Sequence, residues 1–322
     1  MPTEADLIQR YLCCGPWRTD VVKGIGDDAA VVHVPGGNEL AVCVDTLVAD
    51  VHFLASTDPA DLGYKALAVN LSDLAAMGAQ PAWAMLALTL PWADEGWLAA
   101  FSKGLLALAR AHGVQLIGGD LSRGPLSITL QAMGFLPRGI ALYRDRARPG
   151  DVVFVTGSIG DAGLGLAVLQ GECKLDLTSS KYCMSRLNRP TPRVSAGLAL
   201  RGLASTAIDV SDGLAVDLER LLIASNVGAT VELTHIPLSN AVRAAFVETV
   251  DWRLVLTAGD DYELLFTVPA ARARELAPRT KTLDCYLTRI GCIETAPGLR
   301  YALDGESLEL AVPPGYDHFA RA

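Results

Sequence analysis

The sequence lacks a cysteine pattern, a zinc motif and a long apolar run, and each absence excludes a class of protein. Its seven cysteines form no Cys-x-x-Cys pair, which argues against a disulfide framework or a zinc ribbon. Its five histidines form no His-Glu-x-x-His motif. Apolar stretches such as residues 82–90 fall well short of the ~18 residues that a membrane span needs. Residues 1–11 lack a basic start and a long apolar core, so we expect no signal peptide and a cytoplasmic location.

Positive charge is also scarce, since the formal net charge is −9 at pH 7. A nucleic-acid or anionic-membrane partner needs a basic face, so we expect neither. An acidic protein can still bind polyphosphates when divalent cations bridge the two. With 322 residues, 51% of them hydrophobic, the chain is long enough for two domains and for a sizeable core.

Predicted strands and helices alternate along the chain, with several strand-to-strand turns, which favours an α+β or mixed α/β fold. Residues 137–151 are rich in Arg, Pro and Gly, so we place the domain junction there, between residues 1–137 and 138–322. The expected strands are residues 39–45, 82–90, 114–120, 126–135, 152–157, 205–210 and the two sides of an acidic turn within 253–268. The expected helices are Asp58 to a stop at Gly78, 94–113, a helix after a glycine-rich turn within 158–170, and 211–226 with Ser211 as its N-cap.

Aspartates recur at the ends of these predicted strands. They are Asp45, Asp120, Asp209 and Asp212, the pair Asp260 and Asp261, and the pair Asp27 and Asp28 after Gly-Ile-Gly. Asp73 differs, because it lies within an apolar helix, three residues after Asn70. Carboxylates without His or Cys ligands favour magnesium or manganese over zinc, and such sites bind substrate phosphates. The pattern therefore predicts metal-assisted phosphoryl transfer. In the alternative interpretation, each Gly-Asp-Asp is a simple turn and Asp73 pairs with Lys65.

Neither common nucleotide-binding loop is present. Gly24, Gly26 and Ala29 match the dinucleotide pattern Gly-x-Gly-x-x-Ala, but a strand-like stretch follows where that motif needs a helix. No Walker A sequence occurs. The turn at residues 156–165 joins a strand to a helix, and its amides either hold an anion or form a simple tight connection.

Seven motifs, taken together and in order, resemble those of thiamine-monophosphate kinases, within the superfamily of PurM-like ATP-dependent enzymes. They are GIGDDAAVV, VDTLVADVHF, NLSDLAAMGAQP, LIGGDLSRGPLSITLQAMG, RPGDVVFVTGSIGDAGLGL, IDVSDGL and AGDDYELLF. They cover residues 24–266, and PPGYDHF near the C-terminus is a looser match. The resemblance implies two PurM-like α+β domains with mixed sheets flanked by helices, the first pairing with a second subunit in a homodimer and the second closing over ATP. It also implies transfer of the γ-phosphoryl group of ATP to thiamine monophosphate, giving thiamine diphosphate and ADP.

The resemblance assigns residue roles motif by motif. It implies several magnesium ions held by Asp28, Asp45, Asp73, Asp120, Asp209 and Asp212. It implies ATP contacts at Gly119, Asp120, Arg144 and Ser211, and contacts to the thiamine phosphate at His52, Asp260 and Tyr316. Taken alone, His52 reads as a structural histidine, Arg144 as a linker residue and Tyr316 as part of a docked tail. No other catalytic residue is assigned, because the acceptor phosphate is a dianion near neutral pH and needs no strong general base.

The sequence departs from the family pattern at three places, one of which is Tyr316, where another aromatic residue is frequent. Cys43 and Val44 precede Asp45 where Ser or Thr is frequent, and Asp260 stands where Glu is commoner. Two other functions remain as alternatives. One is a sister PurM-like enzyme, such as an aminoimidazole ribonucleotide synthetase, a selenophosphate synthetase or a hydrogenase-maturation protein. The other is a catalytically silent nucleotide-binding relative.

Overall fold

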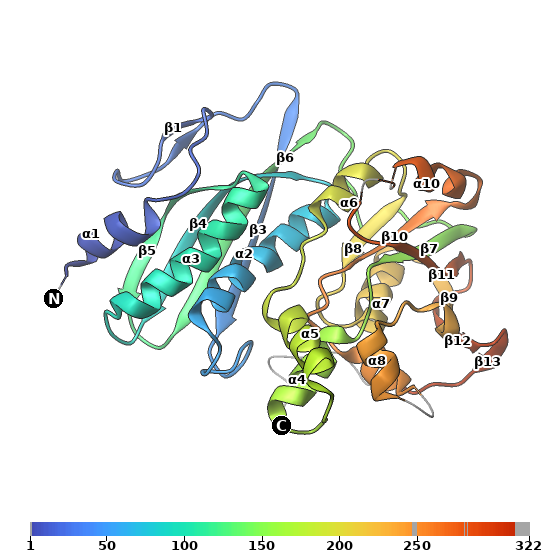
Figure 1. Cartoon of the computed structure of the whole chain (residues 1–322). Coiled ribbons are helices and arrows are strands. Elements are labelled where there is room, and N and C mark those ends of the chain that lie inside the picture. The colour runs from blue at the N-terminus through green and yellow to red at the C-terminus, as the bar shows by residue number, and fades with distance from the viewer. Residues whose placement is uncertain (1, 247–249, 280, 282, 313–322) are drawn as a thin grey trace. The chain divides into compact units, whose positions relative to one another are not determined.

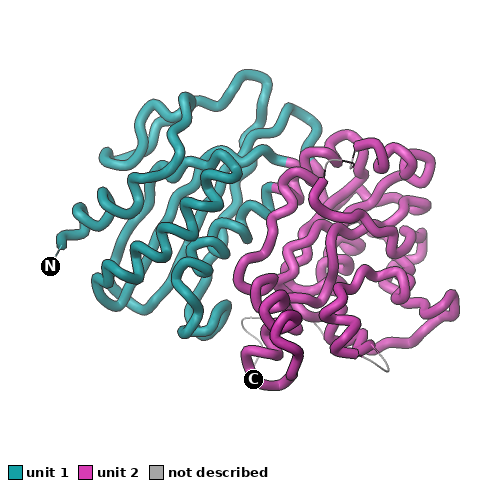
Figure 2. Tube along the Cα trace, in the orientation of Figure 1, with its two compact units in different colours: residues 1–74, 79–141 teal, residues 75–78, 142–322 magenta. Residues whose placement is uncertain are grey.

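The computed structural model describes residues 2–246, 250–279, 281 and 283–312. The chain divides into two compact units (Figure 2): unit 1 holds residues 1–74 and 79–141, and unit 2 holds residues 75–78 and 142–322. Each unit combines a mixed sheet with helices, so the predicted α+β fold is confirmed (Figure 1). No helix in the described part of the chain is long and apolar enough to cross a membrane.

Unit 1 is built on a four-stranded sheet in the order β3-β6-β4-β5, in which only β4 and β5 are parallel. Helices α2 and α3 lie along one face of this sheet (Figure 1). The elements are α1 (Glu4–Leu7), the π-helical turn η1 (Ile8–Leu12), the hairpin β1 (Val21–Lys23) and β2 (Val31–Val32), β3 (Asn38–Val48), α2 (Pro59–Ala76), β4 (Gln80–Leu90), α3 (Glu95–His112), β5 (Gln115–Arg123) and β6 (Ser127–Pro137).

Two glycines allow α2 and α3 to pack closely against each other. A Cβ atom at Gly63 would lie 2.0 Å from the carbonyl oxygen of Phe101, and one at Gly104 would lie 1.8 Å from that of Ala60. Helix α2 begins where the sequence predicts, since the Ala60 N–H donates to the Asp58 carboxylate at 2.7 Å. The crossing fixes both helices over the sheet and so fixes the side chains that α2 presents to β3.

Unit 2 is built on a seven-stranded sheet in the order β13-β12-β9-β11-β7-β10-β8, in which only β12 and β9 are parallel. Its strands are β7 (Asp151–Thr156), β8 (Thr206–Asp209), β9 (Gly228–Glu232), β10 (Leu264–Pro269), β11 (Leu287–Glu294), β12 (Gly298–Leu303) and β13 (Glu306–Leu308). Its helices are α4 (Asp161–Gln170), α5 (Leu177–Asn188), α6 (Val194–Leu200), α7 (Leu214–Ser225), α8 (Asn240–Ala245), α9 (Trp252–Thr257), α10 (Leu276–Arg279) and the 3₁₀ turns η2 (Leu233–His235) and η3 (Ala270–Glu275). Helix α7 packs on β8, β9 and β12, which closes the core around Val153, Leu218 and Leu265.

Two predictions about unit 2 are wrong. Residues 252–257 form helix α9 and not a strand, because the Asp251 carboxylate accepts the N–H groups of Arg253 and Leu254 and starts a helix. Ser211 is not the N-cap of the helix that follows it. That helix, α7, begins after Gly213, which has a φ of +116° and no capping side chain.

The expected strand-end position of two aspartates in unit 1 is also wrong. Asp45 and Asp120 lie within β3 and β5, three residues before each strand ends. The pairing partners explain this, because β3 pairs with β6 as far as Val48 and β5 pairs with β4 as far as Arg123. Strand pairing, and not a loop, therefore sets the direction in which these two carboxylates point.

Candidate active site

In unit 1, Asp45 and Asp73 come together around the thiol of Cys43. Asp45 and Cys43 share the face of β3 toward α2, and Asp73 lies on α2. The thiol lies 3.3 Å from the Asn70 carbonyl oxygen on α2 and 3.8 Å from the Ala132 carbonyl oxygen on β6. Burial first, and then the charges of Asp73 and Asp45, raise the pKa of the Cys43 thiol. A strand and a helix thus bring two of the predicted metal ligands to one place.

Asp120 lies on the opposite face of the same sheet. Through β4 and β6, cross-strand pairing aligns Asp120 with Thr129 and Thr46, whose hydroxyls form a hydrogen bond of 2.9 Å. The Ser122 hydroxyl donates to the Asp120 carboxylate at 2.5 Å. Asp45 belongs to the neighbouring cross-strand row, and successive rows face opposite sides of a sheet. Within unit 1, the predicted ligands therefore fall on two faces.

Asp27 and Asp28 lie exposed between β1 and β2. The Asp28 N–H donates to the Asp27 carboxylate at 3.0 Å, and Lys23 pairs with it at 3.1 Å. These two contacts, the backbone one first, hold the pKa of Asp27 below its usual value. The residues after this turn form strand β2, so the Gly-x-Gly-x-x-Ala match is not a dinucleotide motif.

Two further predicted contacts of unit 1 have structural reasons of their own. Gly119 has a φ of +150°, and a Cβ atom there would lie 1.8 Å from the carbonyl oxygen of Leu86, so the fold itself requires glycine. His52 lies in the turn after β3, where its Nδ1 accepts the N–H of Val48 at 3.1 Å. This hydrogen bond orients the imidazole ring.

In unit 2, Asp209 is the last residue of β8, and Ser211 and Asp212 lie in the connection between β8 and α7. Asp217, in the first turn of α7, accepts the N–H groups of Ser211 at 3.0 Å and of Asp212 at 2.9 Å. Arg220 pairs with the Asp212 carboxylate and, at 2.8 Å, with the Asp217 carboxylate. The conformation of this connection is therefore set by a carboxylate from the helix that follows.

Burial raises the pKa of Asp217 to about 6, and the charges of Asp212 and Asp209 add to this effect. The Asp212 N–H and Arg220 oppose it. Asp217 thus belongs to the site, although no motif in the sequence singles it out. The available signal was an aspartate in the first turn of a predicted helix, where it can accept amides.

The turn at residues 259–262 packs directly on this connection. The Asp260 N–H donates to the Ser211 carbonyl oxygen and the Tyr262 N–H donates to that of Val210, each at 2.8 Å. Both donors have positive φ angles, +67° for Asp260 and +50° for Tyr262. A Cβ atom at Gly259 would lie 2.5 Å from the Ser211 carbonyl oxygen. The predicted substrate contact Asp260 and the predicted ATP contact Ser211 are therefore neighbours.

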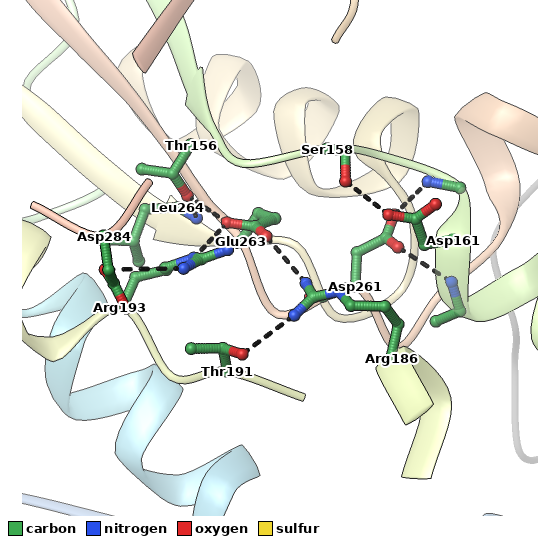
Figure 3. Close-up of polar contacts among 12 residues, drawn as sticks. Thr156, Ser158, Asp161, Arg186, Thr191, Arg193, Asp261, Glu263, Leu264 and Asp284 are labelled. Carbon is green, nitrogen blue, oxygen red and sulfur yellow. Dashed lines mark hydrogen bonds and ion pairs between the residues drawn. The ribbon is translucent and has the colours of Figure 1, made fainter. Parts of the chain in front are cut away.

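A buried ion-pair network lies beside this turn (Figure 3). Glu263 is fully buried and accepts two hydrogen bonds of 2.6 Å from the Arg193 guanidinium. It also accepts the Thr156 hydroxyl at 2.6 Å and an Arg186 N–H at 2.8 Å. These bonds join β7, α5 and the residue before β10 to the segment that precedes α6.

The other member of the Gly-Asp-Asp pair, Asp261, points toward the N-terminus of α4 (Figure 3). Its carboxyl group, 1% exposed, accepts the N–H groups of Gly160 at 2.7 Å and of Ala162 at 3.3 Å. Burial raises the pKa of Asp261 to about 8, and the charge of Asp161 adds to this effect, while the Gly160 amide opposes it. The group that accepts the amides of the 156–165 turn is thus an internal carboxyl group, and the turn is a tight connection.

Two predicted contacts remain, Arg144 and Tyr316. Arg144 is exposed, and its carbonyl oxygen accepts the Ser225 hydroxyl at 2.9 Å. Tyr316 lies outside the described residues. Within either unit, the described residues contain no group of three His, Cys, Asp or Glu side chains that could hold a metal ion.

Comparison with known proteins gives the family of the chain. The families described as AIR synthase related protein, N-terminal domain and C-terminal domain, match residues 26–136 and 148–301. A thiamine-monophosphate kinase from Escherichia coli O157:H7 is 50% identical over 320 residues, which are 98% of each chain. The chain belongs to the thiamine-monophosphate kinase family. The resemblance inferred from the seven motifs is confirmed.

Two solved structures of this family have the same fold. The crystal structure of thiamine-monophosphate kinase from Stenotrophomonas maltophilia is 47% identical, with a TM-score of 0.84 over 90% of this chain and 93% of that one. The structure of AaThiL complexed with AMPPCP and TMP is 32% identical, with a TM-score of 0.78 over 92% of each chain. The PurM-like two-domain architecture expected of the family is therefore confirmed.

Proposed function

We propose that this protein transfers the γ-phosphoryl group of ATP to the phosphate of thiamine monophosphate, giving thiamine diphosphate and ADP. The observation that carries the proposal is the 50% identity with a thiamine-monophosphate kinase over 98% of both chains. The complex of AaThiL with AMPPCP and TMP supports the same pair of substrates. A γ-phosphoryl group bonds to an oxygen of the acceptor phosphate as its bond to the ADP oxygen breaks.

The donor set of the candidate site fits magnesium. Asp45 and Asp73 offer only carboxylate oxygens beside Cys43, whose raised thiol pKa makes it a poor metal ligand near neutral pH. Magnesium is commonly held by one or two carboxylates together with substrate phosphates, so a pair is sufficient. We assign several magnesium ions to six aspartates: Asp28, Asp45, Asp73 and Asp120 of unit 1, and Asp209 and Asp212 of unit 2. Bound magnesium would neutralise charge on the reacting phosphates.

The remaining assigned residues orient the two substrates. Gly119, Arg144 and Ser211 contact ATP in this proposal, and His52, Asp260 and Tyr316 contact the thiamine phosphate. The acceptor phosphate is a dianion near neutral pH, so no residue is needed to remove a proton from it. The side chains therefore act by aligning two anions, which can lower the barrier by roughly 7–11 kcal/mol.

The test is a direct assay with ATP, magnesium and thiamine monophosphate, in which thiamine diphosphate is separated by chromatography. Free thiamine is the substrate control. We expect thiamine diphosphate only from the monophosphate, and loss of nearly all turnover in Asp45→Asn and in Asp120→Asn with unchanged circular dichroism. Near-normal turnover in either variant would overturn the metal assignment.

The alternative functions give a different outcome in the same assay. A sister PurM-like enzyme and a silent relative would both bind ATP and form no thiamine diphosphate, so either differs from the kinase in this assay. A cytoplasmic location stays a prediction.

We also propose that the chain is a homodimer formed through the open face of the unit 1 sheet. Leu40, Val42 and Val44 alternate along β3 on the face opposite α2, with exposed fractions of 39%, 50% and 60%. Adjacent exposed apolar side chains on a sheet are typical of an interaction site. Sedimentation of the intact protein should give the mass of a dimer, and Val44→Glu should give that of a monomer. A monomeric wild-type protein would refute this assignment.

A further inference from the structure

We propose that Asp261 is a positioning residue that fixes the 259–262 turn and, through that turn, the Ser211 segment of the candidate active site. The placement of the turn is independent of the reaction, and only the catalytic consequence rests on the proposed kinase function. Asp261 would not contact a substrate itself. It would act through its neighbour Asp260 and through Ser211.

The first observation is the strained backbone on both sides of Asp261. Asp260 and Tyr262 have φ angles of +67° and +50°, in the left-handed region that residues with a Cβ atom rarely adopt. The tyrosine is especially unusual there, because short polar side chains are the ones that tolerate this region. Such conformations persist only where the surrounding structure fixes them, and they cluster at functional sites.

The second observation is that Asp261 is held by its side chain and by its backbone. Its carboxyl group accepts the N–H groups of Gly160 at 2.7 Å and of Ala162 at 3.3 Å (Figure 3). Its carbonyl oxygen accepts an N–H of Arg186 at 3.2 Å, and the same Arg186 nitrogen donates to Glu263. These contacts tie the middle of the turn to α4 and to α5.

The third observation concerns the acceptors to which the strained residues donate their backbone N–H groups. The Asp260 N–H donates to the Ser211 carbonyl oxygen and the Tyr262 N–H to that of Val210, each at 2.8 Å. Gly259 approaches Ser211 so closely that no side chain fits between them. If the turn relaxed toward negative φ, these amides would turn away from Ser211 and Val210. The hydrogen bonds between Asp261 and α4 therefore also fix the position of the connection between β8 and α7.

A simpler role is that Asp261 only caps α4 and leaves the turn unaffected. The chain offers a matched control for that role, because Asp176 caps α5 by accepting the N–H groups of Thr178 at 2.8 Å and of Ser179 at 3.0 Å. Asp176 has no part in the candidate site. A variant at Asp176 therefore shows what the loss of a helix cap alone does.

The experiment compares Asp261→Ala, Asp261→Asn and Asp176→Ala with the wild-type chain by hydrogen–deuterium exchange of the full-length protein. In Asp261→Ala we expect at least tenfold faster exchange in three segments: residues 157–165, 206–213 and 257–264. Asparagine keeps a carbonyl oxygen for the Gly160 amide, so Asp261→Asn should show a smaller change and serves as the variant that folds if alanine does not. Asp176→Ala should accelerate exchange only near residues 176–182.

Exchange that changes only at 157–165 in both Asp261 variants would overturn the proposal and leave Asp261 as a cap of α4. In the kinase assay, we expect kcat/KM for ATP and for thiamine monophosphate to fall at least tenfold in Asp261→Ala, to recover partly in Asp261→Asn, and to stay unchanged in Asp176→Ala. Unchanged KM and kcat in Asp261→Ala would also overturn it. If the wild-type chain makes no thiamine diphosphate, the kinase function fails, and the exchange measurement still decides the role of Asp261.

Discussion

The two units use carboxylates in opposite ways. Among the described residues, every buried Asp or Glu lies in unit 2, and they are Asp151, Asp161, Asp209, Asp217, Asp261 and Glu263. The four aspartates of unit 1 that we assign to metal are exposed or partly exposed. Burying a carboxylate is costly unless donors surround it, so those of unit 2 need the amides and guanidinium groups that contact them.

This difference reflects how each unit positions its functional residues. Unit 1 places Asp45 and Asp120 on strands and Asp73 on a helix, so strand pairing and helix packing determine where they point. Unit 2 places Ser211 and Asp260 on turns, which have no repeating hydrogen-bond pattern to hold them. Buried acids supply the missing hydrogen bonds there. We therefore expect the stability of unit 2 to depend on charge and pH, and the stability of unit 1 to depend on packing.

The largest effect should follow from breaking the ion pair of Glu263. Arg193→Ala removes two hydrogen bonds from a fully buried carboxylate, and loss of one partner of a buried pair costs about 3–5 kcal/mol. Urea unfolding should show this as a lower free energy of unfolding. Arg193→Lys should lower the free energy of unfolding by a smaller amount, because an ammonium group keeps the charge but cannot donate in the same bidentate geometry. The control is Arg272→Ala, which breaks an exposed pair with Glu275 and should change little. Equal unfolding curves for Arg193→Ala and Arg272→Ala would contradict this account of unit 2.

A smaller effect, of a different kind, is expected from crowding the helices of unit 1. In Gly104→Ala the new methyl group would lie 1.8 Å from the Ala60 carbonyl oxygen, so α2 and α3 must separate. Overpacking of this type costs about 1–3 kcal/mol. Gly36→Ala is the matched control, because a Cβ atom there meets nothing within 4 Å. The loss in Gly104→Ala should be the same at low and high salt, and a salt-dependent loss would contradict a packing origin.

The same comparison explains which features could be predicted from the sequence. The start of α2 after Asp58 and most strands follow from local patterns, and these predictions are confirmed. The roles of Asp217, Asp261 and Glu263 were missed. Asp261 bonds an amide 101 residues away and Glu263 a hydroxyl 107 residues away, so no local pattern reveals either contact. Helix α9 was missed because its apolar residues also fit a short strand. The six metal positions stay predictions, because they rest on matching motifs.

The last expected effect is a pH dependence of stability that belongs to unit 2. Burial raises the pKa of Asp261 from 3.8 to about 8, and the charge of Asp161 adds to this effect. The amides of Gly160 and Ala162 and the charge of Arg186 oppose the rise. The folded chain then binds a proton more tightly than the unfolded chain. This stabilising contribution is complete below pH 3.8 and is lost as the pH rises toward 8.

Between pH 7 and 9, carboxyl groups with ordinary pKa values are ionised in both states, and the raised pKa of Asp217, about 6, lies below this range. Comparing Asp261→Asn with the wild-type chain therefore isolates the contribution of Asp261 there. The free energy of unfolding of the wild-type chain should fall across this range, and Asp261→Asn should fall less because its amide does not titrate. Asp27→Asn is the control from unit 1, since the pKa of Asp27 lies below its usual value and this residue stays ionised throughout. Its slope should match that of the wild-type chain. If Asp261→Asn kept the full slope, the pH dependence would have to come from other groups, and the contrast between the two units would rest on the ion pairs of Glu263 alone.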